Sequence, residues 1–182
     1  MKRPARAIAL GVAVLVVAFS VVLATQVGSD TKADTTTSRL LGGRSPAFAV
    51  KTIDGQELTR EGLAGRSVIV NFWNTWCIPC QEELPALKEF FAQHASDSDF
   101  AMVGIVRDDT ANAVRAYVQA EGLHWTIALD PDAVAALAFG TRGQPETFAI
   151  APNGVIVGFQ YGPSRVKDLD QLLAEARGTG NA

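Results

Sequence analysis

The fold of this chain is decided by residues 67–80, which read SVIVNFWNTWCIPC. Residues 67–73 are nearly all apolar and β-prone, which predicts a central buried strand. An amphipathic helical pattern follows, so Cys77 lies at a strand-to-helix junction near the N-terminus of a helix. Backbone N–H groups and the helix dipole stabilise a thiolate there, and cysteine pKa values at such positions fall to roughly 3.5–7.5. The pattern therefore indicates thiol–disulfide exchange.

The chain has two cysteines, Cys77 and Cys80, separated by two residues. Thiol–disulfide exchange needs one low-pKa thiol that attacks and a second thiol that resolves the mixed disulfide. Cys77 precedes the regular helix and fits the attacking role. Cys80 lies one turn inward, on a stripe that continues through Leu84, Leu87 and Phe91, and it fits the resolving role.

A zinc site or an inert core pair is the alternative interpretation of these cysteines. Zinc needs two further ligands, and the chain offers the histidines His94 and His124. Their spacing is far too long for a zinc-finger pattern, so we predict no metal site. We expect His94 to be solvated and His124 to lie in a loop, and neither is assigned a role.

Glu83 and Pro145 each have a functional and a structural interpretation. Glu83 lies three positions after Cys80 on a neighbouring helix face, where a carboxylate can raise thiol pKa values or relay a proton. Alternatively, it is an early-helix acid that complements the helix dipole. Pro145 precedes an apolar strand, which indicates either a cis bond that brings backbone close to the cysteines or an ordinary loop ending. The residues alone leave both questions open.

The remaining pattern predicts an α/β fold. A hairpin around Asp54-Gly55 joins residues 47–50 to residues 56–59. Further strands are expected over residues 100–106, 126–129, 147–150 and 155–161. Helices are expected after the cysteines, over residues 111–121, from Asp130-Pro131 to near Gly140, and after Ser164 as an N-cap. Strands that alternate with helices and end in a hairpin and a helix indicate a central mixed sheet with helices on both faces.

The N-terminus predicts a targeting or anchoring segment. Three basic residues within the first six precede an apolar run over residues 7–24, which exceeds the roughly 7–15 residues of a signal h-region. With residues 25–27 the run approaches the roughly 20 residues that a membrane span needs. We therefore favour an uncleaved transmembrane anchor over a cleaved signal peptide. The expected organisation is a cytoplasmic tail over 1–6, the anchor or signal peptide over 7–27, a linker over 28–44, a folded domain over 45–178 and a tail over 179–182.

The charge balance argues against one class of partner. The 182-residue chain holds 16 basic and 19 acidic residues, and three of the basic residues precede the apolar run. The exported part is therefore mildly acidic, which argues against nucleic acid. The cysteines of the exported part form one close pair. In an oxidising compartment such a pair is more readily explained as redox-active than as a structural disulfide.

Residues 71–80, with Glu83 and Pro85 behind them, resemble the thioredoxin superfamily, and more narrowly the TlpA/ResA/CcmG group of membrane-tethered disulfide reductases. The resemblance extends from about Ser45 to Arg177. It implies a thioredoxin fold with an N-terminal β extension and a central strand–helix insertion. It also implies that Pro145 is cis and packs against the cysteine pair, and that Glu83 tunes the active site.

The stretch Gly143-Gln144-Pro145-Glu146-Thr147-Phe148 is similar to the cytochrome c maturation branch of that group. In that branch the acid after the cis proline lines the active-site groove, and the resemblance gives this role to Glu146. Trp76 offers a flat apolar wall beside the attacking sulfur. The residues expected to bind substrate are Trp76, Ile78, Pro79, Gln144 and Pro145.

One departure from thioredoxin itself concerns Asn71, which stands where thioredoxin carries a buried acid. An amide cannot accept the proton of the resolving thiol, so Glu83 or Glu146 would have to act as the base. Ile78 also departs from the glycine that is common in thioredoxin. Because the residues between the cysteines affect redox poise, the potential does not follow from this sequence.

The resemblance implies a thiol–disulfide oxidoreductase in the cell membrane, single-pass, with its catalytic domain extracytoplasmic, or secreted if the N-terminal segment is cleaved. Its expected substrate is a disulfide in an exported protein, such as apocytochrome c, and a membrane protein would supply electrons. No cofactor is expected beyond the redox-active disulfide of Cys77 and Cys80.

Three alternatives differ from this expectation. The first is an oxidase of the same fold that forms disulfides, since direction depends on potential and partner. The second is a peroxiredoxin-like peroxidase, which Val70 and Asn74 disfavour because that family carries Pro and Thr at these positions. The third is a non-catalytic module that handles haem or copper, which the lack of nearby Met or His ligands disfavours.

Overall fold

The structure, a computed structural model, describes residues 11–13, 15–21 and 37–179. Residues 11–13 and 15–21 are helical and belong to a separate unit from the folded domain. Within the described residues, no helix has both the length and the apolar character that crossing a membrane requires. The predicted tail over 1–6, most of the predicted anchor over 7–27, much of the linker over 28–44 and residues 180–182 lie outside the described residues and stay predictions. Thr179, predicted to begin the C-terminal tail, is the last residue of α5.

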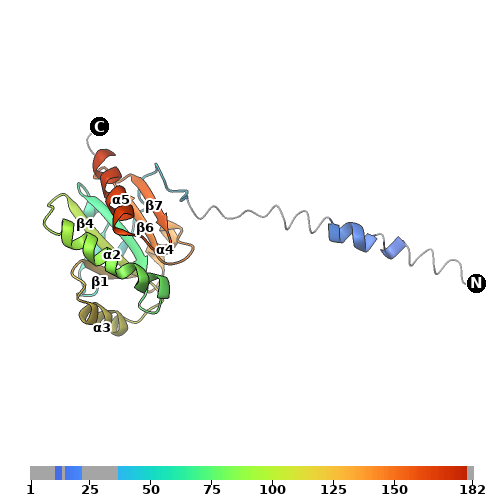
Figure 1. Ribbon diagram of the computed structural model, residues 1–182, viewed down its shortest axis with the longest axis horizontal. Helices are drawn as coiled ribbons and strands as arrows, with labels where there is room; N and C mark the ends of the chain where they lie inside the picture. Colours follow the sequence, from blue (N-terminus) through green and yellow to red (C-terminus); the bar gives the residue numbers. More distant parts are fainter. Residues whose placement is uncertain (1–10, 14, 22–36, 180–182) are drawn as a thin grey trace, which may run out of the picture. The chain divides into compact units, whose positions relative to one another are not determined.

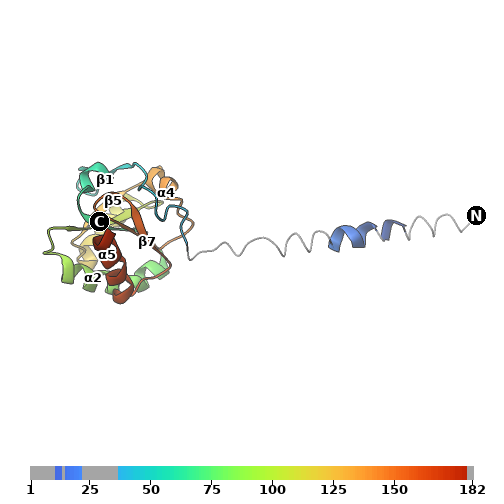
Figure 2. The same ribbon diagram turned by 90° about the horizontal axis from the view of Figure 1, so that it is seen from above.

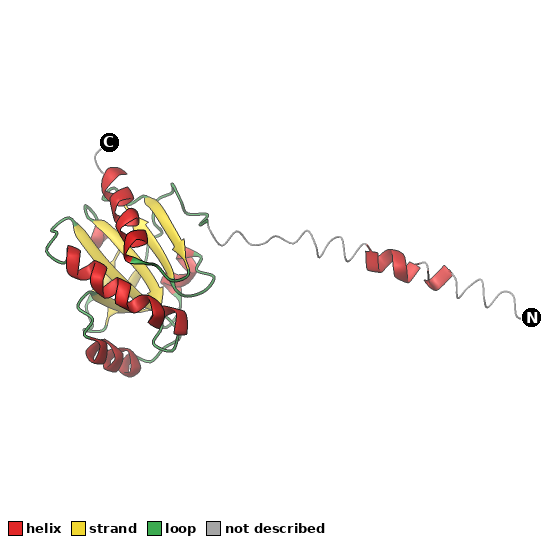
Figure 3. Ribbon diagram, viewed as in Figure 1, coloured by secondary structure: helices red, strands yellow, loops and turns green. Residues whose placement is uncertain are grey.

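The folded domain is built on one seven-stranded sheet (Figures 1 and 3). Its strands are β1 (Ala49–Thr52), β2 (Glu57–Thr59), β3 (Ser67–Trp73), β4 (Phe100–Val106), β5 (Thr126–Leu129), β6 (Glu146–Ile150) and β7 (Ile156–Tyr161). They lie in the order β2-β1-β5-β4-β3-β6-β7. The pairs β3–β4 and β4–β5 are parallel, and the other neighbouring pairs are antiparallel. The predicted mixed sheet is confirmed.

Helices cover both faces of this sheet, as predicted. They are η1 (Glu61–Leu63), α2 (Ile78–His94), α3 (Ala111–Glu121), α4 (Val134–Phe139) and α5 (Val166–Thr179). Side chains of α2, α3 and α5 share one apolar core with one face of the sheet, and side chains of α4, η1 and β1 share a second core with the other face. Figure 2 shows α2 and α5 on the opposite side of the sheet from α4.

Two additions flank the central strands. The β1–β2 hairpin turns at Asp54-Gly55, where Gly55 has a φ of 83° that favours glycine. This hairpin lies at one edge of the sheet and forms the expected N-terminal extension. Between β4 and α4 the chain forms α3 and β5, and β5 pairs with β4. This segment agrees with the expected central insertion.

β3 places the redox pair because it lies inside the sheet, between β4 and β6, and leads directly into α2. All seven of its residues are buried. Ile69 and Trp73 point into the core on the α2 and α5 side, whereas Val70 and Phe72 point into the core on the α4 side. Because strand side chains alternate between faces, Asn71 lies on the side of α2.

Details of three helices differ from the sequence predictions. The buried stripe of α2 continues to Phe90, and Phe91 is only partly buried. Helix α4 begins at Val134 rather than directly after Asp130, but the Asp130 carboxylate still accepts backbone hydrogen bonds from residues 135 and 136 of its first turn. Ser164 does not cap α5 through its side chain, because its hydroxyl is buried without a hydrogen-bond partner among the described residues.

The prediction that His94 is solvated is wrong. Its Nδ1 lies 2.9 Å from Asp97 Oδ2, and its Nε2 lies 3.4 Å from Asp170 Oδ1. The ring also packs against Phe90 and Phe100. His94 therefore links the end of α2 to α5 instead of pointing into solvent.

Candidate active site

The two cysteines lie where β3 leads into the N-terminus of α2. They form a disulfide with Cα atoms 5.2 Å apart. Cys77 is the N-cap residue of α2, and its Sγ accepts a hydrogen bond from the backbone N–H of Cys80 at 3.3 Å. Pro79 occupies the first turn, where the helix does not require its N–H. Because the N–H of Cys80 would also stabilise a Cys77 thiolate, this geometry favours Cys77 as the low-pKa thiol of the reduced pair.

The side chains on either side of Cys77 are exposed, whereas both cysteines are nearly buried. Trp76 is 59% exposed and Ile78 is 67% exposed, against 6% for Cys77 and 5% for Cys80. Exposure therefore does not distinguish the two sulfur atoms in the disulfide form. Their surroundings do, because Cys80 lines a small internal cavity together with Asn71, and Cys77 does not. Trp76 and Ile78 place apolar surface beside the cysteine that is expected to attack.

The loop that carries Trp76 is held by a second loop that sequence reasoning missed. The backbone N–H and the hydroxyl of Thr75 donate to Asp109 Oδ2 at 3.0 and 2.7 Å, and Trp76 Nε1 donates to the Asp108 carbonyl at 3.1 Å. Gln81 Nε2 donates to the Thr75 carbonyl at 2.7 Å. The two aspartates follow β4, which is parallel to β3. Parallel strands finish at the same end of a sheet, so residues just after β4 lie near residues just after β3. The position of the two aspartates just after a strand was the sequence signal that could have indicated this contact.

The Gln144–Pro145 bond is cis, which confirms the prediction for this proline. Pro145 directly precedes β6, whose first residue, Glu146, pairs with Phe72 near the end of β3. Pro145 therefore lies at the same edge of the sheet as the cysteines. Gln144 Nε2 reaches Asn74 Oδ1 at 3.5 Å and so connects the two loops. The expected packing of Pro145 against the disulfide stays a prediction.

Glu83 is buried between α2, β3 and the segment before α5, with 1% of its surface exposed. Its Oε1 accepts the backbone N–H of Ser164 at 2.9 Å, and its Oε2 accepts Asn71 Nδ2 at 3.2 Å. Asn71 Nδ2 also donates to Thr147 Oγ1 at 2.9 Å. Burial raises the pKa of Glu83 from 4.5 to about 7, although hydrogen bonds from Ser164 and Asn71 oppose that rise. These surroundings favour the proton-relay interpretation over that of an early-helix acid that complements the helix dipole, since Glu83 lies beyond the first turn of α2.

Glu146 is equally buried, with 1% exposed, but on the other face of the sheet. It pairs with Phe72, whose side chain packs in the core on the α4 side, and paired residues share a face. Its Oε1 accepts the backbone N–H groups of Arg142 at 2.6 Å and Gly143 at 2.9 Å. The carboxylate therefore holds the loop before the cis bond. The groove-lining role expected from the resemblance stays a prediction.

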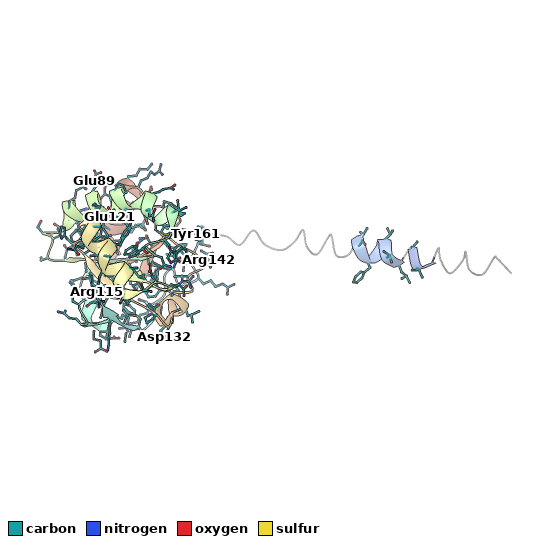
Figure 4. The ribbon with its side chains drawn as sticks, turned by 90° about the horizontal axis from the view of Figure 1, so that it is seen from below. Glu89, Arg115, Glu121, Asp132, Arg142 and Tyr161 are labelled. Carbon is teal, nitrogen blue, oxygen red and sulfur yellow. A yellow bond between two sulfur atoms is a disulfide. The ribbon has the colours of Figure 1, made fainter. Side chains whose placement is uncertain are left out.

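Arg142 and Tyr161 form part of the same edge and were also missed from the sequence. Figure 4 shows them side by side, and the Arg142 Cζ lies 5.5 Å from the ring centroids of both Phe159 and Tyr161. The Tyr161 hydroxyl would lie 3.1 Å from a Cβ placed on Gly143, so the lack of a side chain there leaves room for the ring. The β6–β7 hairpin pairs Tyr161 with Glu146. The register of that hairpin could therefore have indicated that Tyr161 lies beside the loop of Arg142 and Gly143.

The predicted site residues thus fall into two groups. The segment Trp76–Cys80 and the segment Gln144–Pro145 come to one edge of the sheet, with Glu83 on the inner side of α2. Glu146 faces the opposite core and acts on the loop backbone. In the part of the chain that the structure describes, no three His, Cys, Asp or Glu side chains are grouped as metal ligands would be.

Comparison with known proteins supports the arrangement. A family model described as Redoxin matches residues 40–173. The protein named thiol-disulfide oxidoreductase ResA from Bacillus thuringiensis (strain Al Hakam) is 28% identical over 133 residues, which are 73% of this chain and 76% of that protein. The protein named thiol:disulfide interchange protein DsbE from Pseudomonas fluorescens biotype C is 35% identical over 121 residues, which are 65% of each chain.

Solved structures show the same fold. A crystal structure described as a thiol:disulfide interchange protein of the thioredoxin family from Chlorobium tepidum TLS superposes with a TM-score of 0.66 at 28% identity. The match covers 77% of this chain and 98% of that one. The predicted thioredoxin fold is therefore confirmed. The chain belongs to the Redoxin family, and within the thioredoxin-like superfamily it is of the TlpA/ResA/CcmG type.

Proposed function

We propose that this protein is an enzyme, a thiol–disulfide oxidoreductase that reduces disulfides in exported proteins. One observation carries the proposal, the position of Cys77 at the N-cap of α2 with the N–H of Cys80 directed at its sulfur. That position activates one thiol of the pair for attack. The names of the ResA and DsbE relatives support the same activity.

In the first step the Cys77 thiolate attacks one sulfur of the substrate disulfide. A bond forms between Cys77 Sγ and that sulfur, the substrate S–S bond breaks, and the second substrate sulfur leaves as a thiolate that takes up a proton. The product of this step is a mixed disulfide between the enzyme and its substrate. Trp76 and Ile78 provide the exposed apolar surface against which the substrate chain docks.

In the second step Cys80 loses its proton and attacks Cys77 Sγ. The mixed disulfide breaks, the substrate leaves as a dithiol after protonation, and the enzyme keeps the Cys77–Cys80 disulfide, so two electrons pass to the substrate. Glu83 is one helical turn from Cys80, and its pKa of about 7 suits a carboxylate that accepts the Cys80 proton at neutral pH. Asn71 cannot take that proton, and it instead holds the Glu83 carboxylate.

The substrate that we propose is the cysteine pair of an apocytochrome c awaiting haem. The support is the similarity of residues 143–148 to the cytochrome c maturation branch, together with their position beside the redox pair. The catalytic domain would lie outside the cytoplasm, held by the N-terminal apolar segment or released if that segment is cleaved. A membrane protein would return two electrons to the Cys77–Cys80 disulfide. The sulfur pair itself carries these electrons, so the proposal includes no organic cofactor and no metal.

Trapping the intermediate tests the activity. A Cys80→Ala variant is expected to accumulate a mixed disulfide through Cys77 with an oxidised peptide that contains two cysteines separated by two residues. A Cys77→Ala variant is the matched control and is expected to trap little or none. Mass spectrometry of non-reduced samples reads the adduct. An adduct that forms equally well on both variants contradicts the assigned roles.

The direction of electron flow is tested in intact cells. Acid quenching followed by alkylation measures the fraction of the pair that is reduced at steady state, and the proposal expects most of it to be reduced. A pair that is almost wholly oxidised contradicts the reductase and supports a disulfide-forming oxidase. Mixed disulfides isolated from cells with the Cys80→Ala variant would identify the substrate, and their lack of apocytochrome c would overturn that part of the proposal.

A further inference from the structure

A second concave site lies at the end of the sheet opposite the cysteines. Its volume is ≈ 130 Å³, and it lies between η1, the start of β3 and the turn that joins β6 to β7. β3 has seven residues, and each adds roughly 3.3 Å to its length. The pocket at the start of β3 therefore lies about 20 Å from the end of β3 that leads to the cysteines. The pocket is therefore distinct from the redox site.

The floor of this pocket is apolar. It is lined by four buried side chains, each at most 6% exposed: Phe48, Leu63, Val68 and Ile150. An apolar protein cavity of about 150 Å³ is large enough to bind benzene. A pocket of this size and lining therefore accommodates an apolar group of about six carbons.

The rim of the same pocket is basic. It carries the guanidinium groups of Arg44, Arg60 and Arg66 and the carboxylate of Glu61. Arg60 binds Glu61, with Nε donating to Oε1 at 2.9 Å. Neither Arg44 nor Arg66 forms an ion pair with any residue in the part of the chain that is described. The pKa of Glu61 is lowered first by its hydrogen bond from Arg60 and also by the nearby charge of Arg44. With three guanidinium groups and one carboxylate, the rim still carries an excess of two positive charges.

Backbone contacts fix two of these arginines. Arg60 Nη1 donates to the Ser45 carbonyl at 2.9 Å, and Arg66 Nη2 donates to the Gly62 carbonyl at 3.2 Å. The third, Arg44, extends over the β6–β7 turn, since its Nε would lie 3.9 Å from a Cβ placed on Gly154. Guanidinium groups that are already held at a pocket lose less conformational freedom when they bind a ligand.

We propose that this pocket binds an amphiphilic anion, with a carboxylate or phosphate head between Arg44 and Arg66 and a short alkyl chain on the apolar floor. Arginine pairs with planar carboxylates and with phosphates through two parallel N–H···O bonds. The apolar floor gains free energy when an alkyl group displaces water from it. The same chemistry is found in a free alkyl carboxylate and in a phospholipid with an anionic headgroup.

Titration of the isotopically labelled full-length protein tests this site by nuclear magnetic resonance. Octanoate and monomeric dihexanoyl-phosphatidylglycerol are the two anionic probes, and octanol and dihexanoyl-phosphatidylcholine are their controls without net negative charge. We expect saturable shifts of the backbone amides of Gly65, Asn153 and Gly154, with those of Cys77 and Cys80 unchanged. A response to octanoate alone identifies a free carboxylate as the ligand source, and a response to the phospholipid alone identifies a lipid headgroup.

Two variants separate the charged rim from the apolar floor. Arg44→Gln combined with Arg66→Gln is expected to raise the Kd of the responding probe at least about tenfold, because two charge-assisted contacts are lost. Ala64→Phe, at an exposed position that lines the pocket, is expected to abolish saturable binding. Lys167→Gln, at an exposed position on α5, is the control for the loss of a positive charge outside the pocket and should leave the Kd unchanged.

Several results would overturn the proposal. They are the lack of a saturable shift with either anionic probe, equal binding of octanol and octanoate, and an unchanged Kd in the double arginine variant. Because both arginines lie at the surface, this double variant remains informative even if Ala64→Phe folds poorly. Turnover at the cysteine pair should be the same in the double variant and in the unmodified protein.

Discussion

Glu83 and Glu146 are each 1% exposed, yet they lie on opposite faces of the same sheet. Glu83 packs on the side of the redox helix and accepts one backbone N–H and one side-chain amide. Glu146 packs on the side of α4 and accepts two consecutive backbone N–H groups on a single oxygen. Two buried acids near one active site therefore have different partners and, in our interpretation, different tasks.

The difference shows that burial alone does not make an acid catalytic. The donors of Glu146 belong to the loop before the cis proline, so this carboxylate determines where the loop lies. The donors of Glu83 do not offset its desolvation, and its pKa rises to about 7. Only small changes in its surroundings are then needed for Glu83 to release or take up a proton at neutral pH.

The largest expected effect concerns stability against pH, and the variant is Glu83→Gln. A carboxyl whose pKa is raised from 4.5 to about 7 in the folded state stabilises the fold fully below pH 4.5 and loses that contribution as the pH rises through 7. Between pH 4.5 and pH 8, the fall in the free energy of unfolding should therefore be larger in the unmodified protein than in Glu83→Gln, and the difference should be about 3 kcal/mol. Urea denaturation at several pH values measures this. Equal slopes in the two proteins would show that Glu83 does not titrate in this range.

A smaller effect on stability is expected for Glu146→Gln. The amide oxygen keeps a weaker hydrogen bond to the N–H groups of Arg142 and Gly143, so the free energy of unfolding at pH 7 should fall by about 1–2 kcal/mol. Hydrogen exchange of those two amides should accelerate, whereas the same measurement on Glu83→Gln should leave them protected. An unchanged stability and unchanged exchange would remove the structural task that we assign to Glu146.

The smallest effect is expected where the hydrogen bond from Asn71 to Glu83 is removed. Asn71→Ala takes away a donor that lowers the pKa of Glu83, so the pH midpoint of the stability change should move upward, by less than about one unit. The titration of the Glu83 carboxyl carbon, followed by nuclear magnetic resonance, gives that midpoint directly. A midpoint that moves downward would contradict the direction assigned to this hydrogen bond.

The features predicted correctly from the sequence depend on short stretches of chain. The apolar run over 67–73, the cysteine spacing and the hairpin at Asp54-Gly55 each specify local structure. The cis bond at Pro145 came from the resemblance, supported by the position of a proline before an apolar strand. These patterns were sufficient for the α/β class and for the position of Cys77.

The missed features depend on contacts between residues that are far apart in the chain. Asp109 lies 34 positions from Thr75, and Ser164 lies 81 positions from Glu83. No local pattern specifies which backbone N–H will reach a buried carboxylate, because that is decided when α5 packs on α2. The choice of Phe90 over Phe91 for the core of α2 has the same origin. Both residues fit an amphipathic stripe, and tertiary packing selects one of them.

The most direct test of the whole account is the pH dependence of substrate release from the mixed disulfide. Stopped-flow measurement of this step, in the unmodified protein and in Glu83→Gln, isolates the attack of Cys80 on Cys77. If Glu83 accepts the Cys80 proton, the rate in the unmodified protein rises with pH through an inflection near 7 and then levels off, and Glu83→Gln lacks that inflection. Identical profiles for the two proteins would contradict the account, because they would show that Glu83 carries no proton in the exchange.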